Sequence, residues 1–139
     1  KDGPATKHDI SVPVADMPAF VVEASRAVES RFAGARVHAF GHLGDGNVHF
    51  HVRAPAGSAP DWAKAHSDVI SPFVHDLVVA AGGSISAEHG IGQMKRDELA
   101  RLSTPARMYA LNGIKRAFDP RNLFNPGKLV SLAPERRDQ

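Results

Sequence analysis

The chain has 139 residues, 42% apolar and 23% charged, and it contains no cysteine. This composition excludes a disordered chain, a collagen-like repeat and a disulfide scaffold. The length favours a single soluble domain over 1–139. Seventeen Lys and Arg stand against fifteen Asp and Glu, for a net charge of +2, and because the charges are interspersed we do not expect nucleic acid as a partner. No apolar run approaches the ~20 residues that span a bilayer, and the absence of cysteine is compatible with a reducing cytoplasm, where we place the protein.

The first elements are a strand and a helix. Residues 8–14 alternate in polarity and predict a strand, which Pro13 restricts to an edge or an end because proline lacks an amide donor. Asp16 as a cap and Pro18 in the first turn predict a helix that stops near Gly34. Its apolar stripe consists of Phe20, Val21, Ala24, Ala27 and Val28.

Residues 36–53 predict two strands around a tight turn at Asp45-Gly46, a favoured pair for a two-residue hairpin. A helix is predicted over 61–81, and Pro72 should kink or break it. A short strand at 84–87 follows, and then two helices, at about 90–102 and from Thr104-Pro105 to about Phe118. This order predicts an α+β fold, a ferredoxin-like βαββαβ unit with a C-terminal helical extension. Helices should cover one face of its sheet.

The predicted hairpin suggests a metal site. With Asp45 and Gly46 as the central turn residues, His42 would lie opposite His49, Phe40 opposite His51, and His38 opposite Arg53, all on one face. Directly opposed Cβ atoms are about 4.5–5.5 Å apart, close enough for two imidazoles to hold one ion. The alternative is a polar sheet face with scattered histidines. We expect this face to be open in the chain, and to self-associate or pack on a partner.

Glu88-His89 can complete the site. A carboxylate would give a His₂Glu set, and three protein ligands leave a position open for substrate. The alternative for this pair is helix capping, since a carboxylate near a helix N-terminus is favourable in any case. The chain has eight histidines, and for His8, His66 and His75 we expect surface or capping positions instead of a ligand role.

Four ordered segments, KHDISVPV, FGHLGDGNVHFHV, GGSISAEHGIGQMK and DPRNLFNPGKLV, resemble the C-terminal domain of FAD-linked oxidases. This family includes D-2-hydroxyglutarate dehydrogenase, D-lactate dehydrogenases and the D subunit of glycolate oxidase. The resemblance runs from about Lys7 to Val130 and implies the second half of a lid over a flavin. The FAD would be bound mainly by a domain of the parent protein outside this chain, so the chain should be inactive alone.

The resemblance also implies residue roles. His42, His49 and Glu88 match the family's ligands for a divalent metal, usually zinc. His89 matches the residue that accepts the proton of the substrate hydroxyl, and Lys7 matches a lysine that binds the substrate carboxylate. In the NPGK motif, Asn125 lies near the flavin in relatives.

Position 51 departs from the family pattern, because the hydroxyglutarate enzymes often carry an asparagine there that contacts substrate. With His51 at this position, the identity of the group at the distal end of the substrate stays open. His51 is either a substrate-binding residue or an interface residue.

The resulting function hypothesis is the oxidation of a small D-2-hydroxy acid to the 2-oxo acid. A 2-hydroxy acid can chelate the ion, which favours the developing alkoxide, and a neutral imidazole accepts the hydroxyl proton. Two alternatives stay open: a ferredoxin-like sensing module for small molecules and a metal-dependent hydrolase. A homo-oligomer is also possible.

Overall fold

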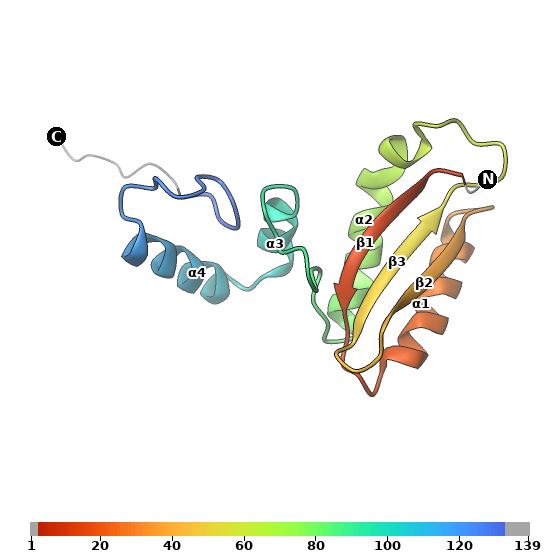
Figure 1. Cartoon of the computed structure of the whole chain (residues 1–139), viewed down its shortest axis with the longest axis horizontal. Helices are drawn as coiled ribbons and strands as arrows, with labels where there is room; N and C mark the ends of the chain where they lie inside the picture. The colour runs from red at the N-terminus through yellow and green to blue at the C-terminus, as the bar shows by residue number, and fades with distance from the viewer. Residues whose placement is uncertain (1–2, 133–139) are drawn as a thin grey trace. The chain divides into compact units, whose positions relative to one another are not determined.

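The structure is a computed structural model, and residues 3–132 are described. They group into two compact units that divide between Gly90 and Ile91. The elements are β1 (Ala5–Ser11), α1 (Met17–Arg31), β2 (Arg36–His42), β3 (Asn47–Arg53), α2 (Trp62–Ala80), α3 (Arg96–Leu102) and α4 (Pro105–Phe118) (Figure 1). The first unit ends after α2 and a short irregular segment, and the second contains α3 and α4. The single domain over 1–139 stays a prediction.

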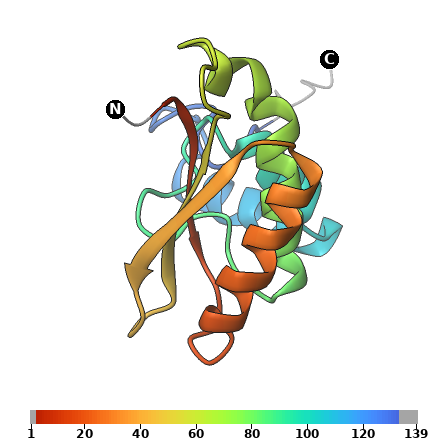
Figure 2. The same cartoon turned by 90° about the vertical axis from the view of Figure 1, so that its right-hand side faces the viewer.

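The first unit is a three-stranded antiparallel sheet in the order β1-β3-β2. Both of its helices, α1 and α2, lie on the same face of this sheet (Figure 2). The mixed α and β composition and the one-sided helix layer were predicted from the sequence. The strand and helix order of 8–81 was predicted as well, although β1 begins three residues earlier than the predicted 8–14.

The predicted fourth strand at 84–87 does not form, so the structure does not show the four-stranded ferredoxin-like sheet. Within the described residues this segment makes a single bridge, between Ser84 and Ser11 of β1. The reason is that the next amides are engaged elsewhere. Ser86 N donates to Ser84 Oγ (3.3 Å), and Ala87 N donates to the carboxylate of Asp9 (3.2 Å). Those amides cannot extend a ladder along β1.

The predicted hairpin register is wrong by two residues. His42 lies opposite Asn47 and not opposite His49, which instead lies opposite Phe40. The loop therefore has four residues, 43–46, because the Asp45 side chain accepts the amide of Asn47 (3.1 Å) and shapes the turn. A slip of two residues keeps every side chain on its predicted face, whereas a slip of one would have inverted them all.

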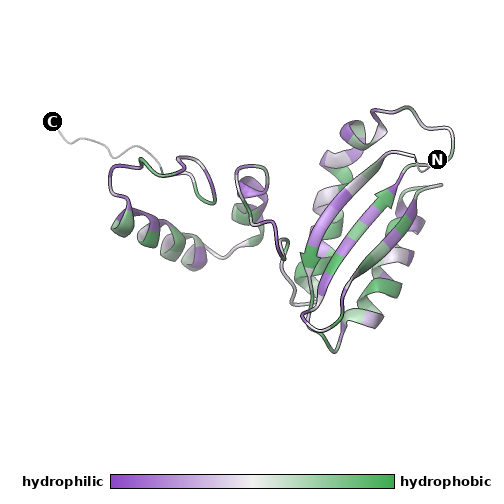
Figure 3. Ribbon diagram, in the orientation of Figure 1, coloured by the Kyte–Doolittle hydropathy of each residue, from purple (hydrophilic) through white to green (hydrophobic). Residues whose placement is uncertain are grey.

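The core lies between the sheet and its helices. Along β3, apolar residues alternate with polar ones, which Figure 3 shows as alternating colours. The buried apolar side chains of this core are Ile10, Val12, Met17, Phe20, Ala24, Val28, Ala35, Val48, Phe50, Val52, Ile70, Val74 and Val78. In α2, Ile70 and Val74 are buried on either side of Pro72. Of the kink or break predicted at Pro72, the break does not occur, because the helix is continuous from Trp62 to Ala80. Packing of this apolar stripe thus outweighs the ~3 kcal/mol that an interior proline costs a helix.

Two histidines that we expected at the surface or in caps are buried in this core. His8 Nδ1 donates to the carbonyl of Phe50 (3.0 Å), and its Nε2 then accepts from Ser71 Oγ (3.1 Å). The ring of buried His75 packs edge-on against His8, with centroids 5.6 Å apart. Both are therefore part of the packing between β1 and α2. The half-buried His66 stacks on Trp62 at 4.5 Å.

The second unit is organised differently. Its first helix, predicted over about 90–102, begins only at Arg96, and α4 spans Pro105–Phe118 as predicted. Thr104 caps α4 by accepting the amide of Arg107 (3.2 Å). Asp119 then holds the following loop, since its carboxylate accepts the amides of Leu123 and Phe124, each at 2.8 Å. Of the helices in residues 3–132, none combines the length and apolarity needed to cross a membrane.

Candidate functional site

The candidate site lies on the sheet face that α1 and α2 leave uncovered. Because alternate side chains of a strand share a face, the register places the polar residues of this face in four rows across β1, β3 and β2. The rows are Ser11–Asn47–His42, Asp9–His49–Phe40, Lys7–His51–His38 and Ala5–Arg53–Arg36. Every predicted site residue of the strands is on this face.

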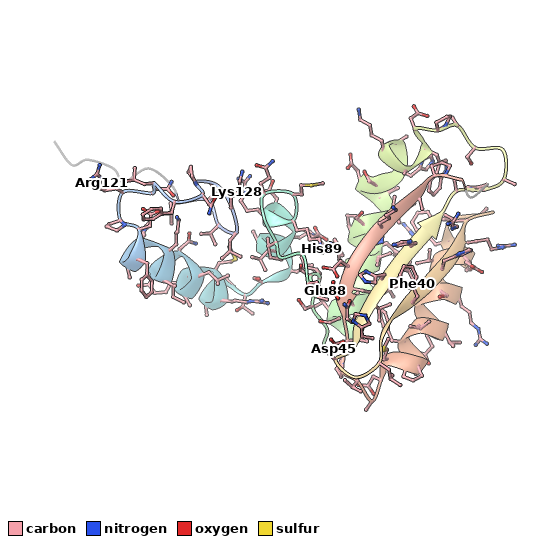
Figure 4. The ribbon with its side chains drawn as sticks, in the orientation of Figure 1. Phe40, Asp45, Glu88, His89, Arg121 and Lys128 are labelled. Atoms are coloured by element: carbon pink, nitrogen blue, oxygen red, sulfur yellow. The ribbon has the colours of Figure 1, made fainter. Side chains whose placement is uncertain are left out.

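Glu88 joins the first of these rows. Its Oε1 accepts a hydrogen bond from Asn47 Nδ2 and lies 3.7 Å from His42 Nδ1. Figure 4 shows Glu88 and His89 beside the sheet, at the end where the hairpin carries Asp45. Two of the three predicted metal ligands, His42 and Glu88, are thus in contact, although the hairpin register that suggested the site is different.

His49, the third predicted ligand, lies in the next row. Its ring is 5.2 Å from that of Phe40 and 6.4 Å from that of His89, measured between centroids. The His89 side chain is 70% exposed, which leaves its ring accessible to a small molecule on this face. The imidazole of His42 thus lies beside Glu88, and the imidazoles of His49 and His89 lie near each other at the same end of the sheet.

Asp9 is the residue that the sequence analysis missed. Its Oδ2 accepts the amides of Ala87 (3.2 Å), Glu88 (3.1 Å) and His89 (2.9 Å), and it lies 3.8 Å from His89 Nδ1. The side chain is buried, in the centre of β1 and opposite His49. The sequence did contain a signal for Asp9. Aspartate is depleted in strands, so an aspartate inside a predicted strand indicates a specific contact for its carboxylate.

The donor atoms here suit a divalent cation. Among the described residues, Asp9, Glu88 and His89 each offer one ligand atom, and these atoms lie within 4.8 Å of one another. Imidazole and carboxylate are the ligands that zinc takes in catalytic sites. Asp9 Oδ2 already accepts three amides. Among the described residues, His42, His49 and Glu88 do not form a second group with ligand atoms this close, although His42 lies 3.7 Å from Glu88. The side-chain types on this face, imidazole and carboxylate, are those that zinc takes.

The third row is cationic. Lys7 lies opposite His51 on β3, and His38 lies on its other side. Burial lowers the pKa of His51, and the positive charge of Lys7 lowers it further. A neutral His51 beside Lys7 provides a hydrogen-bonding group next to a positive charge, an arrangement suited to a carboxylate. An open pocket lined in part by Arg36, His38 and Arg53 continues the positive character toward the far end of the face.

Asn125 belongs to the second unit. It has a left-handed backbone, with φ of +46°, and its carbonyl accepts the amide of Lys128 (3.2 Å), which makes the NPGK segment a tight turn. The side chain of Asn125 is exposed. Its predicted role near a flavin stays a prediction.

Comparison with known proteins identifies the family of the chain. The family described as "FAD linked oxidases, C-terminal domain" matches residues 1–129. The chain is 37% identical over 125 residues to a D-2-hydroxyglutarate dehydrogenase of Stutzerimonas stutzeri, covering 90% of this chain and 27% of that protein. It is 36% identical over 121 residues to a D-lactate dehydrogenase of Anaerostipes hadrus, covering 87% and 25%.

A third relative is the mitochondrial D-2-hydroxyglutarate dehydrogenase of Arabidopsis thaliana, 34% identical over 94% of this chain and 22% of the relative. The chain thus spans about a quarter of the length of the curated relatives it matches. Because the family match extends over nearly all of its residues, the chain belongs to the FAD-linked oxidases, as their C-terminal domain.

Proposed function

We propose that this chain is the metal- and substrate-binding portion of an FAD-dependent dehydrogenase that oxidises a small D-2-hydroxy acid to the 2-oxo acid. D-2-hydroxyglutarate, D-lactate and glycolate are the candidate substrates, and the names of two relatives support the first two. FAD would be bound mainly by a domain of the parent protein outside this chain. The family match favours this function over the sensing module and the hydrolase.

The proposal includes a divalent metal, with zinc as the first candidate, held by His42, His49 and Glu88. One observation carries it: Glu88 lies 3.7 Å from His42 on the uncovered face, with His89 next to it in sequence. When bound, the metal supplies Lewis-acid polarisation of the substrate oxygen, and FAD supplies the two-electron oxidation. Both groups need residues that orient the substrate, and the face provides candidates for that task.

The roles of the chain's own residues follow from their rows. His89 accepts the proton of the substrate hydroxyl, as an exposed imidazole beside a proposed ligand. Lys7 and His51, one row beyond His49, bind an anionic group of the substrate. Successive rows are about 6.6–6.8 Å apart, at ~3.3–3.4 Å per residue, which suits an acid whose second carboxylate is a few carbons from the first. Asn125 would lie near the flavin and help to bind it.

Location and assembly complete the proposal. We place the protein in the cytoplasm, although the Arabidopsis and rat relatives are named as mitochondrial. Association with the FAD-binding domain, or a homo-oligomer, would cover the sheet face that the first unit leaves open.

Zinc titration of the 139-residue chain, followed by calorimetry, tests the metal site. We expect about one ion per chain, no binding by His42→Ala, and weaker binding below about pH 6 as the imidazoles protonate. His38→Ala is the matched control, since His38 is on the same strand and face but two rows away from His42. Full binding by the double variant His42→Ala/His49→Ala would refute the ligand assignment.

Kinetics of the full-length parent enzyme test the residue roles. His89→Asn should lower kcat for every substrate by about 10²–10⁴-fold with the metal retained. His51→Asn should change the ratio of kcat/KM between D-2-hydroxyglutarate and D-lactate while the reaction still proceeds. A near-normal kcat in His89→Asn would place the base elsewhere.

A further inference from the structure

We propose that Asp9 is a positioning residue, which holds Glu88 and His89 in place over the sheet through their own backbone amides. This inference rests on the proposed function, in which Glu88 binds the metal and His89 accepts the proton. Asp9 itself would contact neither the metal nor the substrate. It would act through the segment that carries both groups.

Three consecutive backbone amides donate to the side chain of Asp9, and all three point to the same oxygen. One carboxylate oxygen, Oδ2 of Asp9, accepts the amides of Ala87, Glu88 and His89 at 3.2, 3.1 and 2.9 Å. Successive amides that converge on one point form an anion-binding concavity, and here the anion is a side chain of the protein. Hydrogen bonds to an ionised acceptor are stronger than neutral ones. The segment is therefore tied to β1 by the charge on Asp9.

The position of Asp9 explains why this segment needs an anchor. Residues 87–89 have no helix or strand structure, and the Glu88 and His89 residues are exposed. Asp9, in contrast, is buried in the centre of a strand and lies opposite His49 on β3. The same residue thus sets the distance between the sheet, which carries His42 and His49, and the loop, which carries Glu88. Misplacement of a reacting group by about 1 Å can cost about 10²-fold in rate.

A role as a metal ligand is the competing interpretation, because Asp9, Glu88 and His89 form a cluster with donor atoms within 4.8 Å. The three amides on Oδ2 argue against it, since a cation at that oxygen would face three N–H groups whose positive ends point toward it. The positive ends of these amides suit a carboxylate and repel a metal.

The experiment compares Asp9→Asn with Asp16→Asn in the 139-residue chain. Both substitutions remove one negative charge, but Asp16 is exposed and its side chain makes no cap hydrogen bond. We expect Asp9→Asn to speed hydrogen exchange of the three amides at 87–89 and to weaken zinc binding about 10–100-fold, the usual effect of losing a residue that orients a ligand. Core amides such as Phe50 should keep their protection, and Asp16→Asn should match the wild type.

Each outcome has a defined meaning. Wild-type zinc affinity together with unchanged exchange at 87–89 in Asp9→Asn would overturn the inference and leave the proposed function standing. If the wild-type chain binds no zinc, the proposed metal site fails, while faster exchange at 87–89 in Asp9→Asn would still support the anchor. If Asp9→Asn does not fold, Asp9→Glu keeps the charge and moves it by one methylene. Shifted amide signals at 87–89 and weaker zinc binding would then support the inference, and unchanged values would overturn it.

Discussion

The two units of this chain are built on different principles. The first encloses a core of thirteen buried apolar residues between its sheet and helices. In the described part of the second, Leu99 and Val130 are the buried apolar side chains, α4 contributes none, and Tyr109 and Phe118 are each 84% exposed. Hydrogen bonds around Asp119 organise its final loop instead. The first unit therefore draws its stability from apolar burial, and the second from local polar contacts.

Truncating one aromatic ring in each unit tests this difference most strongly. Phe50 is fully buried in β3, and Phe50→Ala should lower the free energy of unfolding by about 3–5 kcal/mol. Phe118→Ala, at an exposed position of α4, should change it by less than about 0.5 kcal/mol. Urea unfolding is followed by the fluorescence of Trp62, the single tryptophan, for the first unit, and by the absorbance of Tyr109, the single tyrosine, for the second. Equal losses in the two variants would remove the distinction between the units.

Glycine substitutions should have opposite signs in the two units. A Cβ on Gly41 of β2 would lie 2.0 Å from the carbonyl oxygen of Asn47, so Gly41→Ala must push the hairpin apart. We expect a loss of about 1–3 kcal/mol, as for other overpacked sites. Gly113 in α4 has open space around it, and Gly113→Ala should stabilise that helix by about 0.5–1 kcal/mol. Thermal unfolding measures both, and a stabilising Gly41→Ala would contradict the close approach of β2 and β3.

The smallest predicted effect is a pH dependence confined to the second unit. Burial by itself raises the pKa of Asp119, but hydrogen bonds from Lys115 and from the amides of Leu123 and Phe124 lower it to about 2, from an ordinary value of 3.8. Because the folded pKa is the lower one, the carboxylate stabilises the folded loop above about pH 4. That contribution should disappear as the pH falls to about 2.

Carbon-13 NMR of the Asp119 carboxyl group measures this titration directly. The variant Lys115→Met is the matched comparison, since it removes the ammonium group 2.5 Å from Asp119 Oδ2. Its Asp119 pKa should rise toward the ordinary value. A wild-type midpoint near 3.8 would show that the polar contacts do not hold the loop as described.

Sequence patterns predicted those features that depend on neighbouring residues. The alternation of Val48, Phe50 and Val52 with polar residues assigned the two faces of β3, because side chains alternate along any strand. The stripe that includes Phe20, Ala24 and Val28 located α1 in the same way. The ordered motifs indicated the family, which the family match over 1–129 confirms.

The sequence pattern did not predict the hairpin register, because Asp45-Gly46 is compatible with both a two-residue and a four-residue loop. The deciding contacts are the bond from the Asn47 amide to the Asp45 side chain and the bond from the Val12 amide to the Gly46 carbonyl (3.0 Å). The second of these joins the turn to another part of the chain. Pro72 also depends on distant residues. The helix stays continuous around it because Ile70 and Val74 pack in a core shared with the sheet and α1.

The sequence by itself thus determined which residue types face the open side of the sheet, since that follows from a local period of two residues. Tertiary structure decided which of them meet. Glu88 reaches His42, and Asp9 holds the amides of residues 78 to 80 positions later, because the chain returns to the edge of β1 after α2. No local pattern encodes that return. It depends on how α2 packs its buried stripe, Ile70, Val74 and Val78, against the sheet.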